Sequence, residues 1–146
     1  MLPLEDTNVL DVTQVVAGSF CSLQLADLGA DVLKVERVNG GDIGRSNPPF
    51  VGDRSAYFSS VNRNKKSIAL DLKSDEGREA FLRLAEAADV VVENYKPETM
   101  ERFGLGYEDV RAVNEEIVYC SISGFGQTGP YADHPALDIV AQAMAG

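Results

Sequence analysis

Short apolar segments alternate with amphipathic segments along the whole chain, and no other feature of the sequence constrains the fold as much. Strands are expected over residues 8–12, 31–35, 67–72, 89–92 and 117–121. Helices are expected between and after them, over residues 19–28, 74–88, 99–103, 107–113 and 135–145. Strands that alternate with helices in this way form a parallel sheet covered on both faces. The pattern predicts an α/β fold with a Rossmann-like, doubly wound, mainly parallel sheet.

Two segments carry more specific expectations. In the first helix, Phe20, Leu23 and Leu28 are spaced to share the buried side, and Gly29 follows where a C-cap glycine belongs. Residues 37–55 are rich in Gly, Pro, Asn and Asp and have no hydrophobic period, so we expect a long surface loop there. Ordered loops of this length in compact domains are often functional.

The charge balance limits the choice of partners. The 146 residues include 13 Lys and Arg against 23 Asp and Glu, a formal net charge of −10, which argues against nucleic acid because phosphate binding needs a basic face. No apolar run reaches the length of a membrane span, and the N-terminus is acidic where a signal peptide is basic. We therefore expect a cytoplasmic protein without a membrane partner. Cys21 and Cys120 are too few, and too far apart in sequence, to indicate a disulfide scaffold, and no metal-ligand set is visible.

The residues that follow the strands are the candidate site, because ligands of parallel sheets bind at the carboxyl ends of the strands. Polar and charged groups cluster there: Thr13–Gly18, Glu36, Arg37, Asp71, Lys73, Glu93, Asn94, Tyr95, Lys96 and Arg102. Cations gathered at one edge of an acidic protein favour a small polyanionic ligand with an adenine-type ring. Solvated residues at helix starts are the alternative.

Three further observations narrow the chemistry. Gly18 is the only glycine in the segment TQVVAG, which lacks the dinucleotide fingerprint G-x-G-x-x-G. His134 is alone in its loop and has no second histidine or thiol nearby in sequence. Asp138 opens the last helix, where a carboxylate either caps the helix or takes part in chemistry. The residues by themselves indicate a nucleotide-like ligand and leave the reaction open.

Four segments in order carry a resemblance to a known family. They read VLDVTQVVAG…LADLGADVLKVER, NRNKKSIALDLKSDEG, ADVVVENYKPETMERFGLGYEDV and SISGFGQTGPYADHPALDIVAQAMAG. Together they resemble the N-terminal part of the family III CoA-transferases (CaiB/BaiF type, similar to formyl-CoA transferase). The resemblance implies a CoA-binding Rossmann-like domain and a homodimer of interlocked chains. It also implies an aspartate nucleophile that forms a mixed anhydride with the acyl group, and then an enzyme–CoA thioester that the acceptor acid resolves.

The resemblance also implies roles for individual residues. Contacts with coenzyme A, as substrate or acyl-CoA, fall on Val15, Val16 and Ala17, while Arg37 faces the adenosine phosphates. The rest of the nucleotide and pantetheine path falls on Leu70, Asp71, Leu72, Lys73, Asn94, Tyr95, Lys96 and Arg102. Asp138 matches an acidic position with a supporting role. The nucleophilic aspartate of the family lies past Gly146, so we expect residues 1–146 to be a truncated CoA-binding domain, without the small domain and inactive alone.

Three alternatives stay open. Racemases that act on α-methylacyl-CoA share this fold, but they use a histidine at the position of Leu137, and leucine cannot transfer a proton. A non-catalytic CoA-binding module is the second alternative, and an NAD(P)-dependent dehydrogenase the weakest. The acyl donor and acceptor are not specified by these residues. We also expect the fragment to expose apolar surface and to associate.

Overall fold

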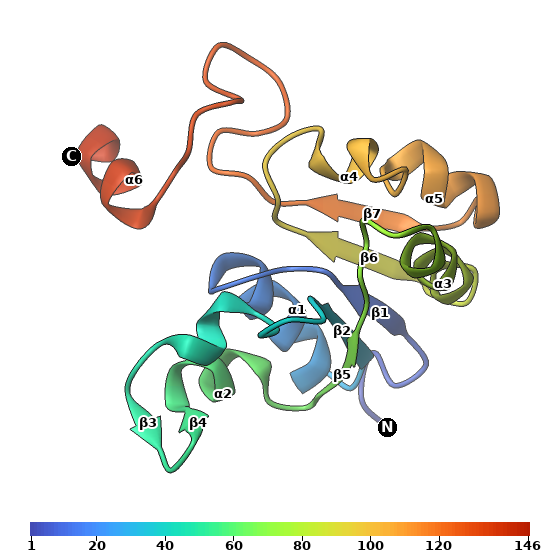
Figure 1. Cartoon of the computed structure of the whole chain (residues 1–146), viewed down its shortest axis with the longest axis horizontal. Helices are drawn as coiled ribbons and strands as arrows, with labels where there is room; N and C mark the ends of the chain where they lie inside the picture. Colours follow the sequence, from blue (N-terminus) through green and yellow to red (C-terminus); the bar gives the residue numbers. More distant parts are fainter.

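The computed structural model describes residues 1–146 and contains a five-stranded sheet in which all neighbouring strands are parallel (Figure 1). The strand order is β5-β2-β1-β6-β7, with β1 at Asn8–Asp11, β2 at Asp31–Glu36, β5 at Lys65–Ala69, β6 at Val90–Glu93 and β7 at Val118–Ser121. The chain moves outward from β1 to β5 and then returns to the other side of β1. The topological switch point therefore lies between β1 and β6, where doubly wound sheets bind their ligands. The predicted fold class is confirmed.

Helices cover both faces of the sheet. One face packs on α1 (Ala17–Asp27), with Ala26 against Val9 and Val32. The opposite face packs on α3 (Asp75–Ala85), α4 (Thr99–Arg102) and α5 (Tyr107–Val113), where Phe81 contacts the cluster that includes Leu10. Adjacent strand residues such as Val9 and Leu10 thus belong to different cores, as the alternation of side chains along a strand requires.

The start of α3 follows the sequence expectation. The hydroxyl of Ser74 accepts a hydrogen bond from the Gly77 N–H at 3.0 Å, and Phe81 and Ala85 on this helix are fully buried. Gly77 also has a packing role, because a Cβ at this position would lie 1.9 Å from the carbonyl oxygen of Asp71. The turn after β5 is therefore tightly joined to the first turn of α3.

The expected buried side of the first helix is wrong in part. Phe20 and Leu28 are 52% and 45% exposed, and only Leu23 of the expected stripe is buried. The sheet instead contacts a small, partly polar face that includes Ser19 and Ser22; its buried members are Gly18, Ser19, Ser22, Leu23 and Ala26. The physical reason is that charged groups of the sheet lie under this helix and need hydroxyl partners. Gly29, with φ +109°, does follow the end of the helix as expected.

Residues 37–55 contain more regular structure than a surface loop. A 3-10 turn spans Ile43–Ser46, and a two-stranded antiparallel hairpin pairs β3 (Phe50–Val51) with β4 (Arg54–Ser55). An unexpected helix, α2 (Ala56–Asn62), follows, and the Ser55 hydroxyl caps it by accepting from the Phe58 N–H. Strand β5 begins two residues earlier than expected and ends at Ala69 rather than at residue 72; Lys65 belongs to it because its side chain is buried against Asp11 rather than solvated.

The last helix, α6 (Asp138–Ala145), lies apart from the sheet at the C-terminal end of the chain (Figure 1). None of its residues is buried, and Leu137, Ile139 and Met144 are exposed. The expectation that the chain associates through apolar surface stays a prediction. None of the helices combines the length and the apolar character that crossing a membrane requires.

Candidate functional site

Two clefts lie beside the carboxyl ends of the strands and share Tyr95. The first has a volume of about 530 Å³ and is lined by Gln14, Val35, Glu36, Arg37, Val38, Asn39, Leu70, Asp71, Leu72, Lys73, Tyr95 and Phe103. The second, of about 320 Å³, is formed between the start of α1, the segment after β6 and residues 122–137. Clefts of this size suit a cofactor-sized molecule, and their position is that of the ligand site in doubly wound sheets.

Most of the expected binding residues line these clefts. Arg37, Tyr95 and residues 70–73 face the first cleft, whereas Ala17, Asn94, Tyr95 and Lys96 face the second. Val15 and Val16 lie in the turn that precedes α1 and line neither cleft, and Arg102 also lines neither, since its guanidinium donates to the Thr99 hydroxyl at 2.9 Å. Phe103 and most of the lining residues at 122–124 and 132–137 were not among the expected binding residues. The segment 122–137 follows β7 but contains no Lys or Arg, so no charge pattern marked it as a binding edge.

Both polar atoms of the Asn94 side chain form hydrogen bonds with the backbone of Gln14. Its Oδ1 accepts from the Gln14 N–H at 2.8 Å, and its Nδ2 donates to the Gln14 carbonyl at 2.8 Å. The Gln14 side chain in turn donates to the Tyr95 hydroxyl at 3.1 Å. Burial raises the pKa of Tyr95, so this hydroxyl stays protonated at neutral pH and keeps a proton to donate at the point where the two clefts meet.

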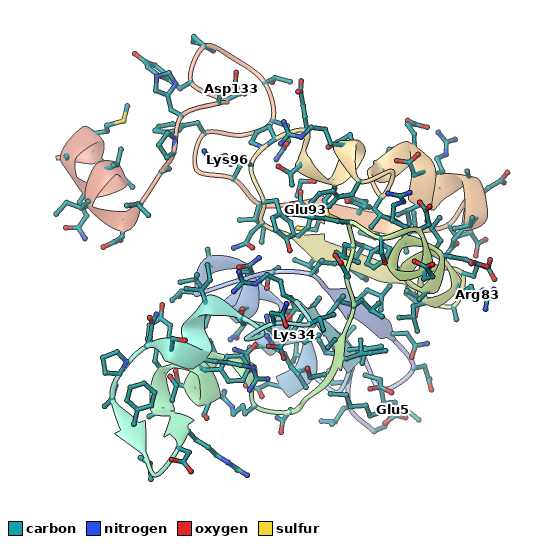
Figure 2. All side chains as sticks on the ribbon, viewed as in Figure 1. Glu5, Lys34, Arg83, Glu93, Lys96 and Asp133 are labelled. Atoms are coloured by element: carbon teal, nitrogen blue, oxygen red, sulfur yellow. The ribbon has the colours of Figure 1, made fainter.

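A buried charge network of Asp11, Lys34, Asp42 and Lys65 lies between the sheet and α1. The four side chains are 1% exposed or less, and Figure 2 shows Lys34 at the centre of the molecule. Asp11 Oδ2 lies 2.9 Å from Lys65 Nζ and 3.8 Å from Lys34 Nζ, and Lys34 Nζ lies 3.0 Å from Asp42 Oδ2. Burial alone would raise the pKa of Asp11, but the two lysines and hydroxyl donors outweigh it and hold that pKa below its ordinary value. The network is charge-balanced, which is what makes its burial tolerable.

Glu36 ties the segment after β2 to the sheet. Its carboxylate accepts two hydrogen bonds of 2.6 Å from Arg45, one of 2.8 Å from the Asp42 N–H and one of 2.5 Å from Ser67. The Arg45 guanidinium also lies 3.9 Å from the ring centroid of Phe58. Burial acts to raise the pKa of Glu36, but these hydrogen bonds outweigh it and lower the pKa to about 2. Glu36 is therefore ionised over the whole physiological range.

Glu93 is a buried carboxylate at the end of β6, on the face opposite to the network. It accepts from the Tyr95 N–H at 2.8 Å, no cation forms an ion pair with it, and burial raises its pKa. It directly precedes the segment Asn94–Pro97, which lines the second cleft. Its hydrogen bond from the Tyr95 N–H joins the end of β6 to the residue that the two clefts share.

The segment that follows β7 forms an aromatic cluster above the second cleft. Phe125, Tyr131 and His134 have ring centroids 5.3–6.5 Å apart, and His134 is exposed. Leu137 lines the cleft, whereas Asp138 does not and accepts a hydrogen bond from Gln142 in its own helix at 2.6 Å. The supporting role of Asp138 stays a prediction.

The two cysteines are neighbours in space although they are distant in sequence. Both thiols are free and pack against the core cluster under α1, and burial together with the adjacent Cys21 thiol raises the pKa of Cys120. No three His, Cys, Asp or Glu side chains are grouped so that they could hold a metal ion together.

The family described as CoA-transferase family III matches residues 4–146. The chain belongs to CoA-transferase family III. It is 56% identical to a succinyl-CoA:mesaconate CoA-transferase of Haloarcula hispanica, over 98% of this chain and 38% of the relative, and 51% identical to a succinyl-CoA:glutarate CoA-transferase of Mus musculus, over 100% of this chain and 34% of the relative. The chain thus spans well under half the length of these relatives.

A solved structure agrees with the family. A CAIB/BAIF family protein from Brucella suis superposes with a TM-score of 0.93 at 42% sequence identity, over 98% of this chain and 39% of that one. The resemblance found in the sequence and the fold expected from it are therefore both confirmed.

The distribution of cations in this family III chain is uneven. Seven of its 13 Lys and Arg side chains form ion pairs with carboxylates. Of the six that form none, three line the clefts: Arg37, Lys73 and Lys96. A protein with a net charge of −10 thus places half of its unpaired cations at the carboxyl edge of its sheet.

Proposed function

We propose that residues 1–146 are the CoA-binding domain of an acyl-CoA:carboxylate CoA-transferase. CoA-transferases use CoA thioesters as substrates, and CoA is a polyanion with an adenine ring. The observation that carries the proposal is the group of three unpaired cations, Arg37, Lys73 and Lys96, that line two clefts sharing Tyr95 at the topological switch point. Such a group suits phosphates better than a neutral or cationic ligand.

In the proposed arrangement, the adenosine phosphates lie at Arg37 and Lys73 in the first cleft. The guanidinium of Arg37 is directed by the hydrogen bond that its Nε donates to the Gly41 carbonyl at 3.0 Å. The pantetheine arm passes Tyr95 and enters the second cleft between Ala17 and Lys96. The thioester then lies at the end of the sheet that the segment 122–137 covers.

The proposed reaction follows the scheme that the family resemblance implies. An aspartate carboxylate attacks the thioester carbonyl and expels CoA thiolate, giving a mixed anhydride. The thiolate then attacks the aspartyl carbonyl of the anhydride and releases the first acid. The acceptor carboxylate attacks the resulting aspartyl–CoA thioester and expels CoA thiolate, and this thiolate attacks the acceptor carbonyl of the second anhydride and releases the aspartate carboxylate. The proposal places the nucleophile in the part of the family's fold that these 146 residues do not include. Complete homologous proteins are proposed to act as cytoplasmic homodimers of interlocked chains.

We propose short dicarboxylic acids as the acyl groups. The relatives named above act on succinyl-CoA with mesaconate or glutarate, and a further relative from Acetobacter aceti, 46% identical, is an acetyl-CoA:oxalate CoA-transferase. Exchange between two dicarboxylates matches the names of the first two. The expected activity of the complete protein is transfer of CoA from succinyl-CoA to such an acid.

Calorimetric titration of the chain with CoA and with 3′-dephospho-CoA tests the binding proposal. We expect CoA to bind more tightly, and Arg37→Ala to weaken CoA by about tenfold, the loss typical of a charged hydrogen-bonding partner. Arg83→Ala is the matched control, because Arg83 is 72% exposed and pairs with Glu79 on α3, away from both clefts. Binding of NADPH without binding of CoA would contradict the proposal. Loss of the α-proton of a 2-methylacyl-CoA, without CoA transfer by the complete protein, would favour a racemase.

A further inference from the structure

The turn of residues 13–16, which joins β1 to α1, has an unusual backbone. Val15 has φ +64°, in the left-handed region that β-branched residues avoid. Val16 begins α1 without a side-chain cap, and Ala17 then forms part of the wall of the second cleft. A strained conformation beside a ligand site persists only where the surrounding structure holds it.

Side chains from separate elements hold this turn through its backbone. Asp11 Oδ1 accepts from the Thr13 N–H at 2.9 Å, and Lys34 Nζ donates to the Thr13 carbonyl at 2.8 Å. Asn94 bonds both the N–H and the carbonyl of Gln14. Four consecutive backbone groups before Val15 are therefore paired with side chains of β1, β2 and the segment after β6.

Asp42 supplies the remaining contact, at the strained residue itself. Its Oδ1 accepts from the Val15 N–H at 3.2 Å and from the Gly44 N–H at 2.7 Å. Its Oδ2 lies 3.0 Å from Lys34 Nζ, but no hydrogen bond is directed at it. The Asp42 N–H is itself held by Glu36. Asp42 is thus fixed from three sides, and its side chain is 1% exposed.

We propose that Asp42 is a positioning residue for the CoA site, acting through the backbone of Val15. Its carboxylate keeps Val15 left-handed, which places Ala17 and the uncapped start of α1 at the wall of the second cleft. Without this acceptor, the Val15 N–H has no partner, and the backbone turns to the negative φ that valine prefers. The inference rests on the proposed binding of CoA, which it deepens by naming a residue that makes no contact with the ligand.

Three substitutions separate this role from a general effect on folding. Asp42→Ala removes the acceptor, whereas Asp42→Asn keeps an oxygen for the Val15 N–H and removes only the charge beside Lys34. Val15→Gly lets the backbone adopt a positive φ without strain. Each variant, and the double variant D42A/V15G, is compared with the wild-type chain by urea denaturation, by calorimetric titration with CoA and by amide hydrogen exchange at Val15.

We expect D42A to weaken CoA binding by about tenfold or more, because the site must first recover a disfavoured backbone conformation. D42N is expected to lose stability, since Lys34 loses an ion-pair partner, but to keep CoA affinity within about threefold of wild type. Adding D42A to V15G is expected to cost less than about threefold in affinity, because glycine reaches the required φ unaided.

The proposal is overturned if D42A binds CoA as wild type does, or if D42A costs the same affinity with and without V15G. A wild-type chain that does not bind CoA refutes the proposed function instead. The exchange measurement then still decides the positioning role. Protection of the Val15 amide in wild type and D42N, and its loss in D42A, supports that role. Equal exchange of this amide in all three chains overturns it. If D42A does not fold, D42N and V15G carry the test, and a D42N chain that folds but binds CoA more than about tenfold more weakly overturns the proposal.

Discussion

Replacing Glu36 by glutamine keeps the size of the side chain and removes the charge that Arg45, Ser67 and the Asp42 N–H stabilise. In the folded chain the pKa of Glu36 is about 2, against an ordinary value of 4.5. At about 1.4 kcal/mol for each pH unit, this difference corresponds to a stabilisation of about 3 kcal/mol at neutral pH. Arg45 is 43% exposed, so solvent screening reduces the figure, and we expect a loss of about 2–3 kcal/mol in E36Q.

The pH dependence gives this prediction its sharpest form. Because folding lowers the pKa of Glu36, its stabilisation is complete above pH 4.5 and is lost as the pH falls towards 2. Urea denaturation of wild type and E36Q between pH 7 and pH 3 should therefore show a difference in unfolding free energy that shrinks to about 1 kcal/mol at pH 3. A difference that is the same at every pH would refute the reasoning, because it would come from packing rather than charge.

A matched control is available on α3. Glu79 also pairs with an arginine, Arg83, but the two side chains are 65% and 72% exposed. Ion pairs of this kind contribute little, so Glu79→Gln should change stability by less than about 0.5 kcal/mol at any pH. A large effect at Glu79 would show that the loss in E36Q is not specific to the buried carboxylate.

Three further predictions concern stability. Folding raises the pKa of Glu93, so burying its ionised carboxylate lowers the stability of the chain above pH 4.5 but not below it. Glu93→Gln should therefore stabilise the chain relative to wild type at pH 7 and not at pH 4, which thermal unfolding at both pH values checks. Phe81→Ala should cost about 3–5 kcal/mol in urea denaturation, whereas Phe20→Ala should cost less than about 1 kcal/mol. Gly77→Ala should sharply lower the melting temperature, because its Cβ would clash with the Asp71 carbonyl.

The parts of the fold that could be predicted from the sequence are those where local pattern and burial agree. The apolar strands around Leu10 and Val91 and the capped start of α3 at Ser74 are examples. The face of α1 could not be predicted in this way, because Ser19 and Ser22 are buried only by virtue of charged residues elsewhere in the chain. Helix α2 was missed because its cap, Ser55, resembles the loop residues that precede it.

The candidate site was predictable to the extent that its residues directly follow strands. Arg37 and Tyr95 were found in this way, and the structure places both in the first cleft. Lys34 and Asp42 were not found, because charged residues in a sequence are usually solvated. One signal existed: Lys34 interrupts an otherwise apolar strand at a position that faces the core, where an unpaired lysine would be very costly.

In the turn before α1, the Thr13 side chain donates to Asp11, whereas residues 14 and 15 are held by contacts to their backbone groups. Asn94 binds peptide groups of Gln14, and Asp42 binds the N–H of Val15, so neither contact depends on what residue 14 or 15 is, provided its backbone can be held there. Val16 is 42% exposed and makes no cap. Position 16 can therefore vary in size and polarity while the path of the chain stays the same.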